Sequence, residues 1–332
     1  MSVKNEMLRL LEANRDTDLS GEQIAEKLGV TRAAVWKAVK SLQADGYEIT
    51  AVNKRGYRLE SSSDRLSAEG IGVFLDRPHE VIVRSEIDST NEEVKRLALQ
   101  GAGEGLVVLS ERQTAGKGRR GRSFFSPDGS GIYMSILFRP TGIDASDIVL
   151  VTTQAAVAVA HAVSEVCHRE AQIKWVNDVY LDGKKICGIL TEAVSDFESG
   201  GIDTVIVGIG INVRKPSELP EELQDIAGYI FDKNEGGGVS RNELAAAVIR
   251  KLCEYYEALP ARDFLEEYRE RSCVIGRQVR FGTPGAVAGK AVDDWRSGLA
   301  TAIDDSGGLV IRLPDGSQEV LHTGEISLRV EE

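Results

Sequence analysis

The segment 113–122, with the sequence Gln-Thr-Ala-Gly-Lys-Gly-Arg-Arg-Gly-Arg, constrains the fold most strongly because of the runs on either side of it. The apolar run 106–109 precedes it and the alternating run 132–138 follows it, so both neighbours are predicted strands. A Gly-rich loop that leads into a strand excludes the Rossmann fold, which needs a helix there. A Walker A loop is excluded as well, because Gly118 follows Lys117 where Ser or Thr is required.

The same loop concentrates positive charge in a chain whose net charge is −12. Its cations alternate with glycines, which let backbone N–H groups approach a ligand closely. The residues concerned are Lys117, Arg119, Arg120 and Arg122 with Gly116, Gly118 and Gly121. The loop is therefore predicted to bind an anion. A small anionic ligand and a nucleic acid are equally compatible with it, since short basic runs serve both.

Length and composition limit the class of protein. A chain of 332 residues exceeds one typical domain, so two or three domains are expected. No run approaches the roughly 18 apolar residues of a membrane span, so no membrane association is expected. The N-terminus lacks the apolar core of a signal peptide, and we expect a cytoplasmic protein. The four cysteines and four histidines lack metal-ligand spacing, so neither a transition-metal site nor a disulfide framework is expected, and any metal ligands are unknown.

The segment 1–62 is predicted to form a winged helix-turn-helix domain. Ser20, with Gln23 three residues later, fits the start of a first helix. Thr31 fits the cap of a second helix over 32–44. Two short strand-like runs with a basic tip follow and predict a β wing.

Positive charge on the second helix and the wing predicts that this domain binds DNA, because the excess of cations suits a duplex. The residues predicted to face DNA are Ser20, Thr31, Arg32, Trp36, Lys37, Lys40, Lys54 and Arg55. The alternative is a module for protein contacts, and Trp36 could instead pack in the core. The polar run 61–64 is a predicted linker to the next domain.

The segment 88–99 is predicted to be a loop that enters a helix. Ser89 and Glu92 fit a capping box, and capping alone would explain Ser89. The alternative is that Ser89, Thr90 and Asn91 present polar groups to a ligand at the positive end of the helix.

The middle of the chain predicts an α+β domain around a mixed or antiparallel sheet. The alanine-rich segment 148–170 is a predicted helix, and the runs 173–181 and 184–192 around Asp-Gly predict one hairpin. The run 205–213 is a further strand, whose glycines indicate close backbone approach. Lys174 lies inside an apolar run, where a lysine usually needs a partner. A lysine that extends its ammonium group to water is equally compatible.

The last third of the chain begins with an irregular segment and ends in strands. The polar segment 216–238 is predicted to be a mobile lid, and 242–258 a helix. The strand-like runs 274–281, 299–304 and 308–313 are separated by turn residues and predict a small β-barrel.

Taken together, these motifs resemble the bifunctional biotin–protein ligase and biotin operon repressor family over nearly the whole chain. Each motif alone is modest, but their order and spacing are specific. Besides the helix-turn-helix and wing, they are Asp-Ser-Thr-Asn at 88–91, the loop 113–122, Lys-Trp-Val-Asn-Asp at 174–178, Gly-Ile-Leu at 188–190, Gly-Ile-Gly-Ile-Asn at 208–212 and Gly-Glu-Ile-Ser-Leu-Arg at 324–329.

The resemblance implies a multidomain fold. The winged helix-turn-helix domain would span 1–62. A central α+β class II synthetase-like biotin/lipoate ligase catalytic domain with a mixed sheet would span 66–270. A small SH3-like β-barrel, which assists ligand and acceptor binding, would span 274–332.

The resemblance also implies roles for individual residues. Biotin would be bound by Ser89, Thr90, Asn91, Gln113, Lys117, Gly118, Arg119 and Lys174. The nucleotide would be bound by Arg119, Arg120, Arg122, Asn212 and Tyr229. The catalytic residues would be Lys174, Lys117 and Arg119. Two residues depart from the family pattern, since Lys117 stands where Arg is usual and Val176 replaces a proline.

The implied activity is the adenylation of biotin by ATP with Mg²⁺, followed by transfer of biotin from biotinyl-5′-AMP to a lysine of a biotin carboxyl carrier protein of a biotin-dependent carboxylase. The implied regulation is repression of biotin genes by a ligand-controlled homodimer on operator DNA, with biotinyl-AMP as corepressor. The alternatives are a non-catalytic regulator that senses a small molecule and a lipoate–protein ligase. The cationic loop with Lys174 favours catalysis, because a sensor need not surround an anhydride with cations.

Overall fold

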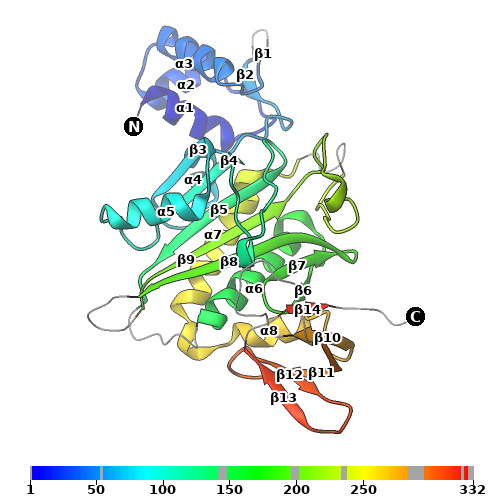
Figure 1. Cartoon of the computed structure of the whole chain (residues 1–332). Coiled ribbons are helices and arrows are strands. Elements are labelled where there is room, and N and C mark those ends of the chain that lie inside the picture. The colour runs from blue at the N-terminus through cyan, green and yellow to red at the C-terminus, as the bar shows by residue number, and fades with distance from the viewer. Residues whose placement is uncertain are drawn as a thin grey trace.

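The computed structural model describes residues 2–52, 55–140, 148–195, 202–232, 238–282, 295–322 and 325–327. It arranges the chain in three parts along one axis, with the helix-turn-helix at one end, a large sheet in the middle and a small sheet at the other end (Figure 1). Lys54 at the wing tip, residues 233–237 of the proposed lid, the turn 283–285 and parts of the terminal motif 324–329 lie outside the described residues.

The N-terminal part contains three helices and a two-stranded wing. Their bounds are α1 Val3–Glu12, α2 Gly21–Leu28, α3 Arg32–Ala44, β1 Ile49–Val52 and β2 Gly56–Leu59. The side chains of Ser20 and Thr31 accept backbone hydrogen bonds from Gln23 and Ala34, so both predicted caps are confirmed. The predicted winged helix-turn-helix is confirmed, and α1, whose Met7 and Leu11 are fully buried, completes its core.

The central part is built on a seven-stranded sheet with the order β3-β4-β5-β9-β8-β7-β6. Strands β3 and β4 are parallel and the other neighbours are antiparallel, so the predicted mixed sheet is confirmed. The bounds are β3 Val81–Ile87, β4 Val107–Gln113, β5 Gly131–Phe138, β6 Gln172–Lys174, β7 Asp178–Leu181, β8 Lys184–Ser195 and β9 Ile202–Asn212.

Helices cover both faces of this sheet, because successive strand residues point to opposite sides. Val108 shares one cluster with Val94 of α5, whereas Val107 belongs to the larger core that contains α6 and α7. The bounds are α4 Ala68–Phe74, α5 Thr90–Leu99, α6 Ile148–Cys167, α7 Arg241–Glu257 and α8 Phe264–Glu270.

Helix α6 corrects the expectation that no apolar run approaches the length of a membrane span. Its window Leu150–Cys167 has 18 residues with a mean hydropathy of 1.3, enough by length and composition to cross a membrane. However, 78% of that window is buried inside the protein. The helix is rich in alanine and valine because the sheet on one side and helices α7 and α8 on the other enclose most of it.

The predicted strand 173–181 is wrong, because the structure divides it into β6 and β7. Trp175, Val176 and Asn177 form a turn between the two strands, which pair antiparallel with Lys174 opposite Asp178. The expected hairpin turn at Asp182 and Gly183 then joins β7 to β8. Lys174 is therefore the last residue of an edge strand and not the middle of a long one.

The C-terminal part is an antiparallel five-stranded sheet with the order β13-β12-β11-β10-β14. Within the described residues its two outer strands do not pair with each other, so closure into a barrel stays a prediction. The bounds are β10 Gln278–Gly282, β11 Arg296–Ile303, β12 Leu309–Arg312, β13 Gln318–Leu321 and β14 Glu325–Ser327.

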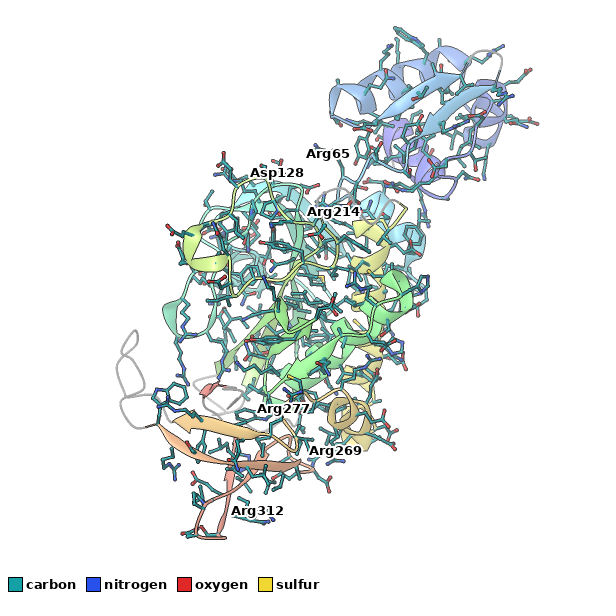
Figure 2. The ribbon with its side chains drawn as sticks, turned by 90° about the vertical axis from the view of Figure 1, so that its right-hand side faces the viewer. Arg65, Asp128, Arg214, Arg269, Arg277 and Arg312 are labelled. Carbon is teal, nitrogen blue, oxygen red and sulfur yellow. The ribbon has the colours of Figure 1, made fainter. Side chains whose placement is uncertain are left out.

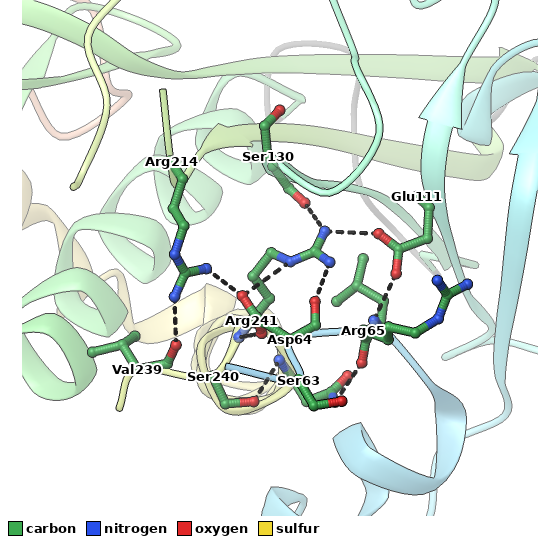
Figure 3. A network of polar contacts seen from close by, with 12 residues as sticks. Ser63, Asp64, Arg65, Glu111, Ser130, Arg214, Val239, Ser240 and Arg241 are labelled. Atoms are coloured by element: carbon green, nitrogen blue, oxygen red, sulfur yellow. Dashed lines mark hydrogen bonds and ion pairs between the residues drawn. The ribbon is translucent and has the colours of Figure 1, made fainter. Parts of the chain in front are cut away.

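A buried polar network fixes the linker between the first two parts (Figure 3). Arg241, which is 1% exposed, donates hydrogen bonds to Glu111 Oε2 and to the Gly131 carbonyl, both at 2.8 Å, and pairs with Asp64 at 3.3 Å. Arg214 also pairs with Asp64. The run 61–64 is thus attached through Asp64 to the seven-stranded sheet and to the start of α7.

Candidate active site

Two adjacent cavities lie between the loop 113–122 and strands β7, β8 and β9. All residues predicted to bind biotin, apart from Lys174, line the first cavity. They are Ser89, Thr90, Asn91, Gln113, Lys117, Gly118 and Arg119. Residues predicted from separate parts of the sequence therefore lie around one cavity.

The second cavity is more strongly cationic. Arg120, Arg122 and Lys174 line it, together with a set of residues that it shares with the first cavity. The shared residues are Gly118, Arg119, Phe124, Asn177 and Lys185. Among the residues that the structure describes, Arg119 and Lys185 are thus the cations that line both cavities.

A chain of hydrogen bonds holds the polar groups of the first cavity in place. Gln113 Oε1 accepts from the Thr90 backbone N–H at 2.8 Å, and Gln113 Nε2 donates to Ser126 Oγ at 2.9 Å. Ser135, fully buried on β5, lies 2.8 Å from Thr90 Oγ1 and 2.5 Å from Asn91 Oδ1. Because these polar groups are held by hydrogen bonds to one another and to the protein, the cavity presents a preorganised polar wall to a ligand.

The glycines of β9 form part of the cavity wall, and side chains approach their backbone closely, as the sequence predicts. A Cβ atom at Gly208 would lie 2.2 Å from Asn91 Oδ1, and one at Gly210 would lie 2.5 Å from the Phe124 ring. Any larger residue at either position would displace the groups that shape the first cavity.

The capping-box explanation of Ser89 is wrong. Ser89 is the N-cap of α5, but its side chain makes no capping hydrogen bond, and it lines the first cavity instead. The carboxylate of Glu92 pairs with Lys117 at 2.7 Å and with Lys95 at 2.9 Å. Helix α5 therefore holds the cationic loop through Lys117.

The Glu92–Lys117 contact predicts a pH dependence. Hydrogen bonds from Lys117 first, and then from Lys95, lower the pKa of Glu92 below its ordinary value of 4.5. Stability from a carboxyl group with a lowered pKa is present above the ordinary pKa and is lost as pH falls through the lowered one. Glu92→Gln should lower the free energy of unfolding at pH 7 by at most about 1 kcal/mol, since the pair is partly exposed. In urea denaturation of both proteins, this difference should shrink as the pH falls below 4.5 and vanish below the lowered pKa of Glu92, and a difference that does not shrink would contradict the assignment.

Arg119 is held at the junction of the two cavities by an amide. Its guanidinium donates to Asn177 Oδ1 at 2.8 Å, and Asn177 Nδ2 donates to the Ile189 carbonyl at 3.0 Å. The loop turns tightly just after it, since Arg120 has φ 60° and Gly121 has φ 72°. The turn between β6 and β7 thus determines where the guanidinium lies.

Two lysines differ in their relation to the cavities. Lys174 lines only the second cavity, and its ammonium group lies 5.6 Å from the centre of the Tyr180 ring. Lys185 lines both cavities and pairs with Asp178 at 2.7 Å. The geometry therefore adds Lys185, which the sequence reasoning missed, to the candidates for contact with the reacting groups.

The structure does not bring Asn212 and Tyr229 into either cavity. Asn212 Nδ2 donates to the Gly228 carbonyl at 3.1 Å. Tyr229 lines a separate, larger hollow together with Arg169 and Lys215. Their roles in nucleotide binding stay predictions.

The predicted DNA-binding face is open to solvent. Arg32, Trp36, Lys37 and Lys40 are exposed on α3, and Trp36 is 53% exposed, so it does not pack in the core. Arg55 is exposed on the wing. Ser20 and Thr31, by contrast, use their side-chain oxygens as helix caps.

No group of three or more His, Cys, Asp and Glu side chains that could hold a metal occurs in the described part of the chain. The four cysteines are buried and are not paired with one another, with Cys187 fully buried. Burial raises the pKa of the Cys187 thiol well above its ordinary range, so it is poorly suited to be a nucleophile.

Comparisons with known families agree with this arrangement in all three parts. Residues 83–212 match the biotin/lipoate A/B protein ligase family, residues 3–58 match an HTH domain, and residues 297–329 match the biotin protein ligase C-terminal domain. Fold and site together define a protein ligase of the biotin/lipoate class that carries a helix-turn-helix domain.

Curated relatives narrow this class further. The bifunctional ligase/repressor BirA of Bacillus subtilis (strain 168) is 31% identical over 331 residues, 98% of this chain and 99% of the relative. The protein of the same name from Escherichia coli (strain K12) is 32% identical over 93% of this chain and 92% of the relative. The chain belongs to the family of the bifunctional ligase/repressor BirA.

A solved structure also resembles the chain. The biotin protein ligase from Aquifex aeolicus, in complex with biotin and ATP, has a TM-score of 0.60 and 30% sequence identity. The match covers 75% of this chain and 98% of that one.

Proposed function

We propose that this protein is an ATP-dependent biotin protein ligase that also represses transcription from biotin genes. The observation that carries the ligase activity is the pair of adjacent cavities, one polar and one cationic, that share Arg119 and Lys185. The first cavity is assigned to biotin and the second to the nucleotide phosphates. We place the protein in the cytoplasm, where biotin, ATP and the carrier protein meet.

In the first step, the biotin carboxylate attacks the α-phosphorus of ATP, pyrophosphate leaves, and biotinyl-5′-AMP forms. Two anions must approach each other, so the protein has to position them and neutralise their charge. Arg119 and Lys185 lie at the junction, where they can contact both the carboxylate and the α-phosphate. The mechanism needs no protein nucleophile.

Magnesium fits the second cavity, because the carboxylate of Asp178 lines it and phosphate oxygens would complete the oxygen ligands that the ion prefers. Bound there, the ion would reduce the charge of the phosphates. Asp178 also orients the Lys185 ammonium group, with which it pairs at 2.7 Å.

In the second step, the amine of an acceptor lysine attacks the carbonyl carbon of the anhydride, an amide bond forms, and AMP leaves. The cations Arg119, Arg120 and Arg122 stabilise the departing phosphate. The acceptor is a carrier domain of a biotin-dependent carboxylase.

A labelling experiment tests the ligase activity. A biotin carboxyl carrier domain incubated with the protein, ATP, magnesium and biotin is expected to gain the mass of one biotinyl group. The same mixture with lipoate in place of biotin should leave the mass unchanged. Labelling by lipoate would instead assign a lipoate–protein ligase, and no labelling with either acid would favour a non-catalytic sensor.

The exposed cations of α3 and the wing support the repressor role. The adenylate would order the loop 113–122 and favour a homodimer, which pairs two helix-turn-helix domains on a two-fold operator. Operator affinity should therefore rise when biotin and ATP are present together. Binding measurements that give the same affinity with and without these ligands would rule out this coupling.

A further inference from the structure

One hydrogen bond joins the C-terminal domain to the turn that lies beside the cationic cavity. Trp175, in the turn between β6 and β7, is 4% exposed, and its indole N–H donates to the Gly307 carbonyl at 2.9 Å. Gly307 lies in the loop between β11 and β12. Because the indole N–H is buried, loss of this acceptor would leave a polar group unsatisfied.

The carboxylate of Asp304 shapes the loop that presents this carbonyl. Asp304 Oδ1 accepts hydrogen bonds from Ser306 N at 2.9 Å, Ser306 Oγ at 2.6 Å and Gly308 N at 2.8 Å. Gly307 between them has φ 77°, a conformation that favours glycine. Burial raises the pKa of Asp304, but the hydrogen bonds from Ser306 and Gly308 outweigh it and the net shift is downward, so the carboxylate remains an acceptor at neutral pH.

Two arginines attach the same loop to the catalytic domain. Arg269 of α8 donates to the Ile303 carbonyl at 2.8 Å and to Asp305 Oδ1 at 2.6 Å, and Arg262 donates to the Asp305 carbonyl at 2.9 Å. Figure 2 shows Arg269 where α8 meets the C-terminal sheet. The loop between β11 and β12 is therefore held by Trp175 and by the two arginines, so it can act as a fixed support for the turn between β6 and β7.

The other side of the turn holds Arg119. Asn177, two residues after Trp175, accepts the hydrogen bond from the Arg119 guanidinium at 2.8 Å. Between them, the Val176 carbonyl accepts from the Tyr268 hydroxyl at 3.3 Å. Each residue of the turn is thus bound to a different element, and a continuous path of contacts runs from Asp304 to Arg119.

We propose that Trp175 and Asp304 are positioning residues for adenylation, through which the C-terminal domain determines where Arg119 lies between biotin and the α-phosphate. The proposal rests on the adenylation assigned to this junction above. The polar wall of Thr90, Gln113 and Ser135 makes none of these contacts. Loss of the support therefore lowers the rate of the chemical step more than it weakens biotin binding.

The test uses Trp175→Phe, which keeps a buried ring but removes the N–H donor, and Asp304→Ala. Each is expected to lower the single-turnover rate of adenylate formation by about 10- to 100-fold, since small misplacements of catalytic groups have effects of this size. The Kd for biotin, measured by calorimetry, should change much less than this rate, because the polar wall stays in place, and urea denaturation checks that the fold is retained.

The chain offers a matched control in Asp315. Its Oδ1 accepts from Ser317 N at 2.9 Å and from Ser317 Oγ at 2.6 Å, so it shapes a similar turn in the same domain, and among the described residues the hydrogen bonds of that turn stay within the C-terminal domain. Asp315→Ala should retain the wild-type rate. A wild-type rate in Trp175→Phe, or equal losses in Asp304→Ala and Asp315→Ala, would overturn the proposal.

A second readout separates this proposal from the proposed function. Trypsin should cleave after the basic residues of the loop 113–122 faster in Trp175→Phe than in wild type, because the turn that carries Asn177, the hydrogen-bond acceptor of Arg119, is held less firmly. If the wild-type protein formed no adenylate at all, the proposed function would be wrong, and the cleavage rates would still decide the positioning role. Equal cleavage rates would contradict it.

Discussion

Replacing Lys185 by alanine is expected to lower the single-turnover rate of biotinyl-AMP formation by about 10²- to 10³-fold, the typical effect of removing one preorganised group that stabilises charge. Lys185 lines both cavities, as Arg119 does, so its ammonium group can lie between the attacking carboxylate and the α-phosphate. The attraction it supplies grows as the charges meet, and the loss should therefore appear in the rate of the chemical step more than in biotin binding. Rapid-quench measurement of adenylate separates an effect on the rate of the chemical step from an effect on biotin binding.

Lys251→Ala is the control for general charge effects. Lys251 lies on α7, pairs with Glu254, and lines neither cavity. It should retain the wild-type rate and the same Kd for biotin. A Lys185→Ala protein that forms adenylate as fast as Lys251→Ala would remove Lys185 from the mechanism.

Lys174→Ala tests the residue that the sequence motif favours. Because Lys174 lines the second cavity, its loss should reduce adenylation far more than stability. Unchanged single-turnover adenylate formation in this variant would refute its catalytic role. Comparison with Lys185→Ala then shows which lysine contacts the reacting groups.

Replacing Arg241 by alanine is expected to lower the free energy of unfolding by about 3–5 kcal/mol, because it leaves the buried carboxylate of Glu111 without its partner cation, whereas Asp64 keeps Arg214. Glu111 is 4% exposed and loses the 2.8 Å hydrogen bond from the guanidinium, and Asp64 loses its 3.3 Å ion pair (Figure 3). Equilibrium urea denaturation measures the change. Since the network joins the linker to β4 and α7, the same variant should loosen the helix-turn-helix domain from the catalytic domain.

Arg112, the residue next to Glu111 on β4, supplies the matched control. Arg112 pairs with Glu86 at 2.9 Å, but both side chains are at least half exposed, so Arg112→Ala should cost at most about 1 kcal/mol. In Arg241→Ala combined with Glu111→Ala, part of the lost stability should return, because one unpaired buried charge is removed with its partner. Equal losses of unfolding free energy in Arg241→Ala and Arg112→Ala would show that burial of the network adds nothing to stability.

Local patterns predicted much of the fold. The caps at Ser20 and Thr31 depend on residues within one helical turn, and both were predicted correctly. The strands on either side of the loop 113–122 follow from apolar periodicity, which predicted β4 and β5. The break after Lys174 was missed, because the apolar residues Trp175 and Val176 continue the run into the turn, where Asn177 is the one residue of a type common in turns.

The sequence predicted the site residues that belong to recognisable motifs. It missed a residue whose position depends on how the strands pack. The sequence placed Thr90, Gln113 and Arg119 at one ligand, and the structure brings them to one cavity. It gave no signal for Lys185, one of two adjacent lysines in a strand run. Which of the two faces the junction depends on the register of β7 against β8, where a bulge lies between Val179 and Tyr180.

By itself, the sequence determined the order of the three parts, the cationic loop and the family, since these depend on residue types and their spacing along the chain. The tertiary structure alone decided that Lys185 and Arg119 line the same two cavities, that Trp175 reaches Gly307, and that the linker is fixed by Arg241. The physical reason is that these arrangements bring together residues 66 to 177 positions apart. Their distances depend on how strands and helices pack, which no local pattern of side chains encodes.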